Sequence, residues 1–346
     1  MWQEKQDGES RKIQFTGGSK YIISLPKKWI SQNQIVKGSF IKLREEEGGL
    51  LTIVPPSLVV PTKVEEAIIK VSSDDNSEII SRKLVSAYLA GYSSILIKPD
   101  KYSISNKQRH EMKNFVRHML VGTEIVSDTP TQLVLQVLLS YPELTIQSAL
   151  RRMSIITTSM HNDALACLAT GDKGLAKDVI STDNEVDRFN LYVTRLLKIA
   201  VYNQRIIKEI GLANVDDCLG YHLVTKYVER TADHAVAIAE NILNIKNKIE
   251  KETLQSIEKM SIVAIGMFTS AMESLFKQDY VEAEGIFHKL EELTEIEKNA
   301  GLMAIKDLED NASLRLIIES IRRTAEYACD IAEIVLNLTI DSILEG

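Results

Sequence analysis

The sequence has few cysteines and no long apolar run. Its three cysteines, Cys167, Cys218 and Cys329, share no CxxC spacing, and the first and last lie in apolar helical stretches where a thiol is a small hydrophobic group. No stretch approaches the roughly 18 apolar residues that span a bilayer. The first ten residues are too polar for a signal peptide. Together with a length of 346 residues, these absences predict a cytoplasmic protein of more than one domain.

Motifs of common enzymes are also missing. The chain shows no HExxH motif, and none of its six histidines has a glutamate three residues before it, as helical di-iron sites require. Residues 60–130 contain no Gly-rich phosphate loop and no nucleophile elbow. We therefore predict that the protein is not an enzyme, and a metalloenzyme of the di-iron type is the least favoured of three hypotheses.

Charge is distributed unevenly along the chain. The net charge is −7, but residues 1–60 hold nine basic and six acidic residues, a net of +3, so the remainder carries −10. A basic segment followed by an acidic one indicates that the first meets a polyanion and the second meets cations or proteins.

The first segment, which we call the head (residues 1–56), reads as β-β-α-β-β. Strands are predicted at 11–15, 21–24, 39–43 and 50–54, with a turn at Gly17-Gly18 and a short helix that starts at Pro26 and ends near residue 32. Four short strands and one helical turn cannot enclose a sufficient core in about 45 residues. We therefore expect the head to form a homodimer or a higher homo-oligomer.

The head resembles the AbrB/SpoVT family of DNA-binding domains. The resemblance lies in the segments Arg11-Lys12-Ile13-Gln14, Gly17-Gly18-Ser19, Ser24-Leu25-Pro26-Lys27-Lys28-Trp29 and Val36-Lys37-Gly38-Ser39. It implies a swapped-hairpin barrel whose basic loops lie on double-stranded DNA. The candidate contacts are Arg11, Lys12, Lys20, Lys27 and Lys28. The alternative is that these are solvated lysines whose charge discourages association of strand edges.

A middle module at residues 60–130 follows Pro55-Pro56 and Pro61. The pattern is β-α-β-α-β, with strands at 64–71, 94–97 and 124–126 and helices at 77–92 and 105–120. Residues 133–139 fit either another strand or the start of a helix. His110 and His118 are expected on the exposed side of the second helix. The module is predicted to be a linker or a regulatory element, and a small-molecule sensor built from backbone groups stays open.

The C-terminal part contains a duplication. Residues 228–243 align with residues 321–336, 93 positions later, with eight of sixteen positions identical. Each copy carries one apolar helical stripe with small residues at its centre, which let a neighbouring helix approach closely. The stripes are Val224, Val228, Thr231, Ala235, Ile238, Ile242 and Ile245, and Ile317, Ile321, Thr324, Ala328, Ile331, Val335 and Leu338.

We predict two three-helix repeats, at residues 146–247 and 252–343, which we call the helical body. The predicted helices are 146–170, 174–210 and 217–247, then 252–277, 280–307 and 312–343. Asp172 and Asp279, 107 positions apart, are predicted to cap the second helix of each repeat.

Carboxylates stand four apart on two helices of the first repeat. Asp183 and Asp187 share one face of the second helix, and Glu229 and Asp233 share one face of the third. Like charges at this spacing repel unless a cation lies between them, and four oxygen ligands suit a hard cation or iron. The alternative is a solvated acidic face on which Arg188 and Arg230 are the partners.

These motifs resemble the PhoU family of phosphate uptake regulators, and together with the head they resemble archaeal members that carry an AbrB domain. The resemblance implies iron or another divalent metal at Asp183, Asp187, Glu229 and Asp233. In the second repeat Arg322, Glu326 and Tyr327 replace Glu229, Asp233 and His234, and the second-helix pair survives at best as Glu291 and Glu295. The second site is therefore expected to be weak or lost.

Two hypotheses about function remain beside the enzyme. The first is a DNA-binding transcriptional regulator of phosphate uptake and homeostasis, with the helical body as sensor or partner-binding module. The second is an interaction protein that dampens a phosphate transporter, through its ATPase subunit, or a kinase, with the head serving only dimerisation. The predicted fold is thus multidomain: a small β-rich swapped-hairpin barrel, an α/β middle module and an all-α body of two three-helix repeats.

Overall fold

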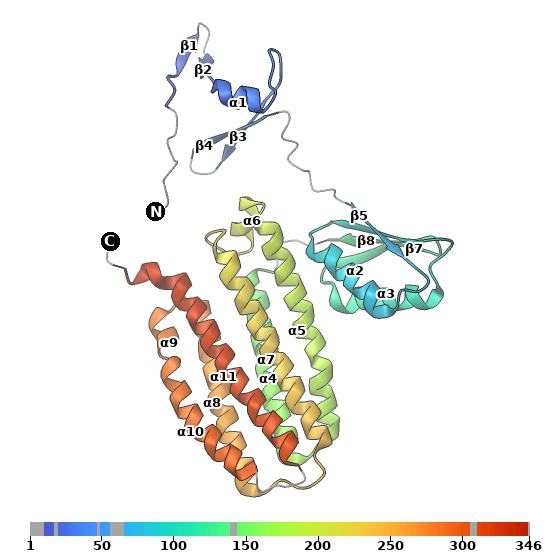
Figure 1. Cartoon of the computed structure of the whole chain (residues 1–346), viewed down its shortest axis with the longest axis vertical. Coiled ribbons are helices and arrows are strands. Elements are labelled where there is room, and N and C mark those ends of the chain that lie inside the picture. Colours follow the sequence, from blue (N-terminus) through green and yellow to red (C-terminus); the bar gives the residue numbers. More distant parts are fainter. Residues whose placement is uncertain are drawn as a thin grey trace. The chain divides into compact units, whose positions relative to one another are not determined.

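The computed structural model describes residues 10–16, 20–46, 49–55, 66–138, 144–304 and 310–344. The chain divides into two compact units, residues 1–64 and 65–346, which are described separately (Figure 1). Among the helices described, none combines the length and the apolar character needed to cross a membrane.

The head consists of two antiparallel hairpins on either side of a short helix. Its elements are β1 (Gln14–Thr16), β2 (Lys20–Ile22), α1 (Lys27–Gln32), β3 (Lys42–Glu46) and β4 (Leu50–Val54). The predicted β-β-α-β-β order is confirmed, with β1 and β3 each beginning three residues later than expected. Pro26 is the N-cap of α1, one residue before the helix, and the predicted turn at Gly17-Gly18 lies outside the described residues.

The middle module is a four-stranded mixed sheet with two helices. Its elements are β5 (Glu66–Val71), α2 (Ser77–Leu89), β6 (Ser94–Pro99), α3 (Asn106–Met119), β7 (Thr123–Thr129) and β8 (Gln132–Val137). The strand order is β5-β6-β8-β7, in which β5 and β6 are parallel and the other neighbours antiparallel. Residues 132–137 are thus a strand, and the sheet continues beyond residue 130, the predicted end of the module. His110 and His118 are exposed, as predicted.

The two central strands of this sheet, β6 and β8, alternate in burial along their length. Ile95 and Ile97 of β6 and Leu133 and Leu135 of β8 are fully buried, whereas the residues between them are only partly buried. This period of two packs one face of the sheet against the helices.

The helical body contains eight α-helices among the described residues. They are α4 (Ile146–Thr170), α5 (Lys173–Ala200), α6 (Gln204–Glu209), α7 (Asp217–Asn244), α8 (Lys251–Lys277), α9 (Tyr280–Glu284), α10 (Phe287–Ala304) and α11 (Asn311–Thr339), followed by the 3-10 turn η1 (Ile340–Ser342). The prediction of one continuous second helix per repeat is wrong. The second helix of the first repeat ends at Ala200 and resumes as α6, and that of the second repeat is interrupted after Glu284, next to Gly285.

The two repeats match in backbone detail. Gly171 ends α4 in the left-handed conformation with φ 74°, and Gln278, 107 positions later, ends α8 in the same conformation with φ 55°. Asp172 accepts the backbone N–H of Gly174 at 2.8 Å, and Asp279 accepts that of Glu282 at 2.9 Å. The predicted capping residues are confirmed, so the duplication extends to helix ends.

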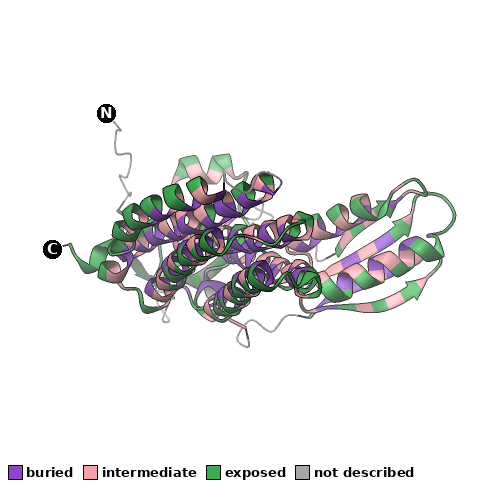
Figure 2. Cartoon of the chain, turned by 90° about the horizontal axis from the view of Figure 1, so that it is seen from below, coloured by how far each residue is buried: buried purple, intermediate pink, exposed green. Residues whose placement is uncertain are grey.

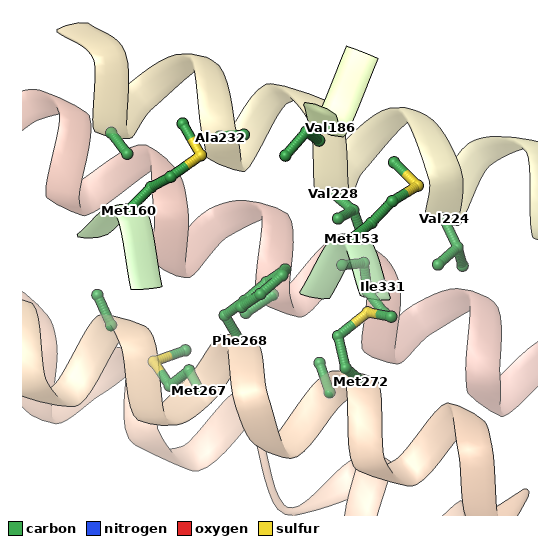
Figure 3. Packing of buried hydrophobic residues seen from close by; sticks show 14 of the residues in the cluster. Met153, Met160, Val186, Val224, Val228, Ala232, Met267, Phe268, Met272 and Ile331 are labelled. Atoms are coloured by element: carbon green, nitrogen blue, oxygen red, sulfur yellow. The ribbon is translucent and has the colours of Figure 1, made fainter. Parts of the chain in front are cut away.

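The core lies between the helices of the two repeats. Both predicted stripes are buried except at their last residues, Ile245 and Leu338, which are half-buried. Figure 2 shows this burial on the sides of the helices that face one another. Met160 and Met267, at equivalent positions of α4 and α8, are both buried in this core (Figure 3).

One arginine of α5 fastens the middle module to the helical body. Arg195, 2 % exposed, donates from its guanidinium to the backbone carbonyls of Tyr88 and Tyr92, the latter at 2.9 Å. The guanidinium also lies over the Tyr88 ring, 4.7 Å from its centroid. Leu191, one turn earlier on α5, packs against the core of the middle module. A buried cation held by two carbonyls and a ring is a fixed contact.

Candidate functional site

The head presents four of its five candidate DNA contacts on its surface. Lys12 precedes β1, Lys20 begins β2, and Lys27 and Lys28 are the first two residues of α1, and all four are exposed. Arg11 is half-buried. The candidates therefore lie on several elements of one small unit, where their charges are available to a polyanion.

The same unit leaves its apolar side chains uncovered. Among the described residues of the head, Pro55 alone is buried, whereas Phe40, Tyr21 and Val36 are 92 %, 76 % and 71 % exposed. Phe15 and Tyr21 pair across the first hairpin, with ring centroids 5.3 Å apart. A β-rich unit with apolar side chains outside and no core has a surface suited to a second copy of itself.

The carboxylates of the first repeat come together across two packed helices. Asp183 and Asp187 lie on α5, and Glu229 and Asp233 lie on α7, which packs against α5. Glu229 is only 9 % exposed, the two residues of α5 are half-buried, and Asp233 is the most exposed of the four. We call these four residues the carboxylate cluster.

Burial and mutual repulsion raise the pKa values in this cluster. Burial raises the pKa of Asp183 to about 7, and the neighbouring charges of Asp187, Asp233 and Glu229 act in the same direction. Burial and then the charge of Glu229 raise the pKa of Asp233 to about 6. The pKa of Asp187 is also raised, by burial and by Glu229. The cluster therefore resists carrying its full negative charge near neutral pH.

Two oxygens of the cluster lack partners. Asp183 Oδ1 and Glu229 Oε2 are buried and accept no hydrogen bond from protein. The other oxygen of Glu229 accepts from Lys226 Nζ at 2.5 Å. Unpartnered buried carboxylate oxygens are chemically suited to a cation. However, in the described part of the chain no three acidic, histidine or cysteine side chains converge into a preformed metal site.

The second repeat carries its own cation at the equivalent place. Arg322, which replaces Glu229, pairs with Glu319 at 2.6 Å, with Glu297 at 3.6 Å and with Glu326. Hydrogen bonding to Arg322 lowers the pKa of Glu319. The acid that α10 contributes is Glu297, whereas the predicted pair Glu291 and Glu295 is exposed and has no ion pair with Arg322 among the described residues.

Two residues of these sites were not found from the sequence. Lys226 stands three positions before Glu229, a spacing that places both on one helix face, and this signal could have revealed it. Glu297 could not be found in this way, because its partner Arg322 lies on another helix and the pairing depends on how α10 packs against α11.

Comparison with family models matches two parts of the chain. Residues 150–242 and 257–335 match the PhoU domain. Residues 14–59 match the family described as antidote-toxin recognition MazE, bacterial antitoxin. Comparison with curated proteins gave no match.

Two solved structures are similar to the helical body. The phosphate transport system regulatory protein PhoU from Streptococcus pneumoniae is 20 % identical, with 58 % of this chain and 96 % of that chain covered and a TM-score of 0.49. PhoU from Pseudomonas aeruginosa is 17 % identical, with 57 % and 96 % covered and a TM-score of 0.50. Because PhoU from Pseudomonas aeruginosa is only 17 % identical to this chain, its similarity shows a shared fold and nothing more.

Proposed function

Because the helical body of this chain is a PhoU domain and its head matches the MazE antitoxin family, we propose that the protein is a DNA-binding transcriptional regulator of phosphate uptake and phosphate homeostasis. The PhoU domain match, together with the resemblance to the PhoU family of phosphate uptake regulators, supports the biological context. The head, with its exposed lysines, supports DNA binding as the mode of action.

The observation that carries the proposal is the exposed combination of apolar and basic side chains on the head. Its uncovered apolar residues favour pairing with a second copy, which would double the number of lysines on one assembly. Lysines that contact phosphates bind duplex DNA through release of counterions. In this proposal the swapped-hairpin barrel forms in the dimer, and Arg11, Lys12, Lys20, Lys27 and Lys28 face DNA.

The test compares two charge-matched variants of the full chain. In the first, Lys12, Lys20, Lys27 and Lys28 are changed to Gln. In the second, the exposed lysines Lys177, Lys248, Lys251 and Lys259 of the body are changed to Gln. Binding to duplex fragments from upstream of phosphate transport genes is measured by fluorescence anisotropy at several salt concentrations. The head variant should lose affinity, and the slope of log K against log salt should fall by about 0.9 for each phosphate contact removed.

The control variant should bind DNA as the unchanged protein does. Equal affinity of all three proteins, or a flat response to salt, would refute the DNA contacts. In that case the second hypothesis gains, namely an interaction protein that dampens a phosphate transporter or a kinase and uses its head only to dimerise. In a pull-down experiment, both variants should then still bind a transporter ATPase subunit.

We also propose that the carboxylate cluster holds iron or another divalent cation. The support is the pair of unpartnered oxygens on Asp183 and Glu229 and the repulsion within the cluster, both of which a cation would relieve. A bound ion would add positive charge to that of Lys226 and Arg230, which already act on Asp233. The residues that would hold it are Asp183, Asp187, Glu229 and Asp233, and the role is structural or regulatory rather than catalytic.

A further inference from the structure

A small polar pocket lies at the seam between the middle module and the helical body. Its volume is about 210 Å³, and it is lined by the end of α3, the start of β7 and one side chain of α5. At about 30 Å³ for each water, it has room for about seven waters or for a small polar molecule. The seam is fixed, because Arg195 and Leu191 of the same helix anchor α5 to the middle module.

The polar groups of the pocket are mainly hydrogen-bond donors. Arg117, in the last turn of α3, and Arg188 of α5 both line it, and no ion pair joins either guanidinium to an acid within the described ranges. Thr123, at the start of β7, is 7 % exposed, and its hydroxyl is buried without a partner. Arg188 Nε is likewise buried and unpartnered.

Leaving the buried Thr123 hydroxyl and Arg188 Nε without a hydrogen bond destabilises the fold, whereas Arg117 is exposed and reaches the pocket from the solvent side. Glu124 is the one acidic side chain that lines the pocket, and it is exposed. A ligand that accepts from two guanidinium groups and a hydroxyl would satisfy all of these donors together.

We propose that this pocket binds a small tetrahedral oxyanion, either free phosphate or the phosphoryl group of a monoester. Guanidinium forks match the oxygen spacing of such groups, and two of them compensate its double charge. The hydroxyl of Thr123 supplies a further donor from the opposite element. This inference deepens the proposed function by naming a ligand class and its site, yet binding can be measured whether or not the protein binds DNA.

The pocket lies next to the carboxylate cluster along the chain. Arg188 directly follows Asp187 on α5, so successive residues of one helix serve the pocket and the cluster. Arg188, Leu191 and Arg195 are spaced by three and four residues, which is the period of one helix face, and this face is turned to the middle module. An anion held by Arg188 would therefore act on the helix that carries Asp183 and Asp187.

The experiment titrates the full chain with inorganic phosphate, and separately with glycerol phosphate, in calorimetry at constant ionic strength set with chloride. We expect saturable binding that Arg188→Gln and Arg117→Gln each weaken at least tenfold. Thr123→Val, which keeps the side-chain shape, should weaken binding about threefold to tenfold. The matched control is Arg82→Gln, which removes an exposed guanidinium from α2 of the same module and should leave affinity unchanged.

The two titrants distinguish the source of the anion. Tighter binding of phosphate supports a site for the free ion, and tighter binding of glycerol phosphate supports a site for a phosphorylated metabolite. Absence of saturation with both, or equal affinity of Arg188→Gln, Arg117→Gln and the unchanged protein, would overturn the proposal. So would an equal loss in Arg82→Gln. Thermal unfolding without ligand verifies that each variant is folded.

Discussion

The two repeats of the helical body both gather acidic side chains on packed helices, but they differ in the charges that surround these acids. In the first repeat four carboxylates meet across α5 and α7, and the pKa of Asp183 rises to about 7 because the group is buried among acids. In the second repeat Arg322 stands at the equivalent place and pairs with three glutamates. The second repeat thus neutralises its acids with an arginine, whereas in our proposal the first repeat binds a divalent cation for this purpose.

The difference teaches that duplication preserved packing more strictly than chemistry. The buried stripes of α7 and α11 and the left-handed ends at Gly171 and Gln278 are shared, because both repeats must fill the same core. The half-buried faces are free to differ. One further difference lies inside the core, where His161 of α4 occupies the position of Phe268 in α8.

The first prediction, with the largest expected effect on the free energy of unfolding, concerns His161, which occupies the position of Phe268. His161 is buried, its Nε2–H donates to the Thr231 carbonyl at 2.8 Å, and Thr324 Oγ1 lies 3.5 Å away. Burial lowers the pKa of His161 to about 4. The unfolded chain takes up this proton below about pH 6.5 and the folded chain only near pH 4, so the contribution of His161 to the free energy of unfolding should decrease by about 3 kcal/mol as pH falls through this window. The raised pKa values of Asp183 and Asp233 contribute with the opposite sign.

His161→Phe, which makes the first repeat like the second at this position, should remove this contribution, so the free energy of unfolding of the variant relative to that of the unchanged protein should rise by about 3 kcal/mol from pH 7 to pH 4. Chemical denaturation at a series of pH values between 4 and 7 measures it. The matched control is His288→Phe, at an exposed position of α10. A difference in the free energy of unfolding between His161→Phe and the unchanged protein that does not vary with pH would contradict the prediction.

The second prediction concerns the divalent cation that we propose at the carboxylate cluster. Manganese at about one hundred times its dissociation constant should raise the free energy of unfolding by about 2.7 kcal/mol if it binds the folded state only. Asp183→Asn combined with Asp187→Asn should abolish this response. The control pair, Glu291→Gln with Glu295→Gln, removes two exposed acids from the second repeat and should retain it. Thermal unfolding with and without the ion provides the comparison, and a full response in the aspartate variant would sink the metal proposal.

The third prediction concerns Arg322, the cation of the second repeat. Arg322→Gln leaves Glu297, Glu319 and Glu326 without their shared partner, and we expect a loss of about 2 kcal/mol in the free energy of unfolding. Arg323→Gln on the same helix is the control, because Arg323 is 47 % exposed and its ion pairs should contribute less than about 1 kcal/mol. Urea denaturation measures both, and equal losses would show that Arg322 has no special role.

The smallest effect probes the packing that the repeats share. A Cβ at Gly220 of α7 would lie 3.1 Å from Ile334 and 3.2 Å from Leu338 of α11, whereas a Cβ at Gly266 of α8 meets nothing within 4 Å. Replacing glycine by valine changes helix propensity in the same direction at both positions, so the difference between the two variants reports on packing. We expect Gly220→Val to be less stable than Gly266→Val by about 1–2 kcal/mol in thermal or urea unfolding. Equal stability would mean that α7 and α11 can separate without cost.

Much of the fold could be read from local patterns. The order of elements in the head and middle module, the helix ends at Asp172 and Asp279, and both buried stripes follow from capping chemistry and helical period, which act over a few residues. The breaks before α6 and after α9 were missed. The apolar pattern continues through them, and only the packing of neighbouring elements decides whether a helix bends there.

For the candidate sites too, some features follow from neighbouring residues and others depend on tertiary packing. Sequence alone determined that this chain holds a basic β-rich head, a duplicated helical body and carboxylates four apart on two helices, because each of these is a property of neighbouring residues. Only the tertiary structure decided that Arg195 would fasten the middle module to α5, that Glu297 would join Arg322, and that Arg117, Thr123 and Arg188 would line one pocket. Apart from Arg117 and Thr123, which are close along the chain, these partners are tens to more than a hundred residues apart, and their proximity depends on how helices and sheet pack rather than on any spacing along the chain.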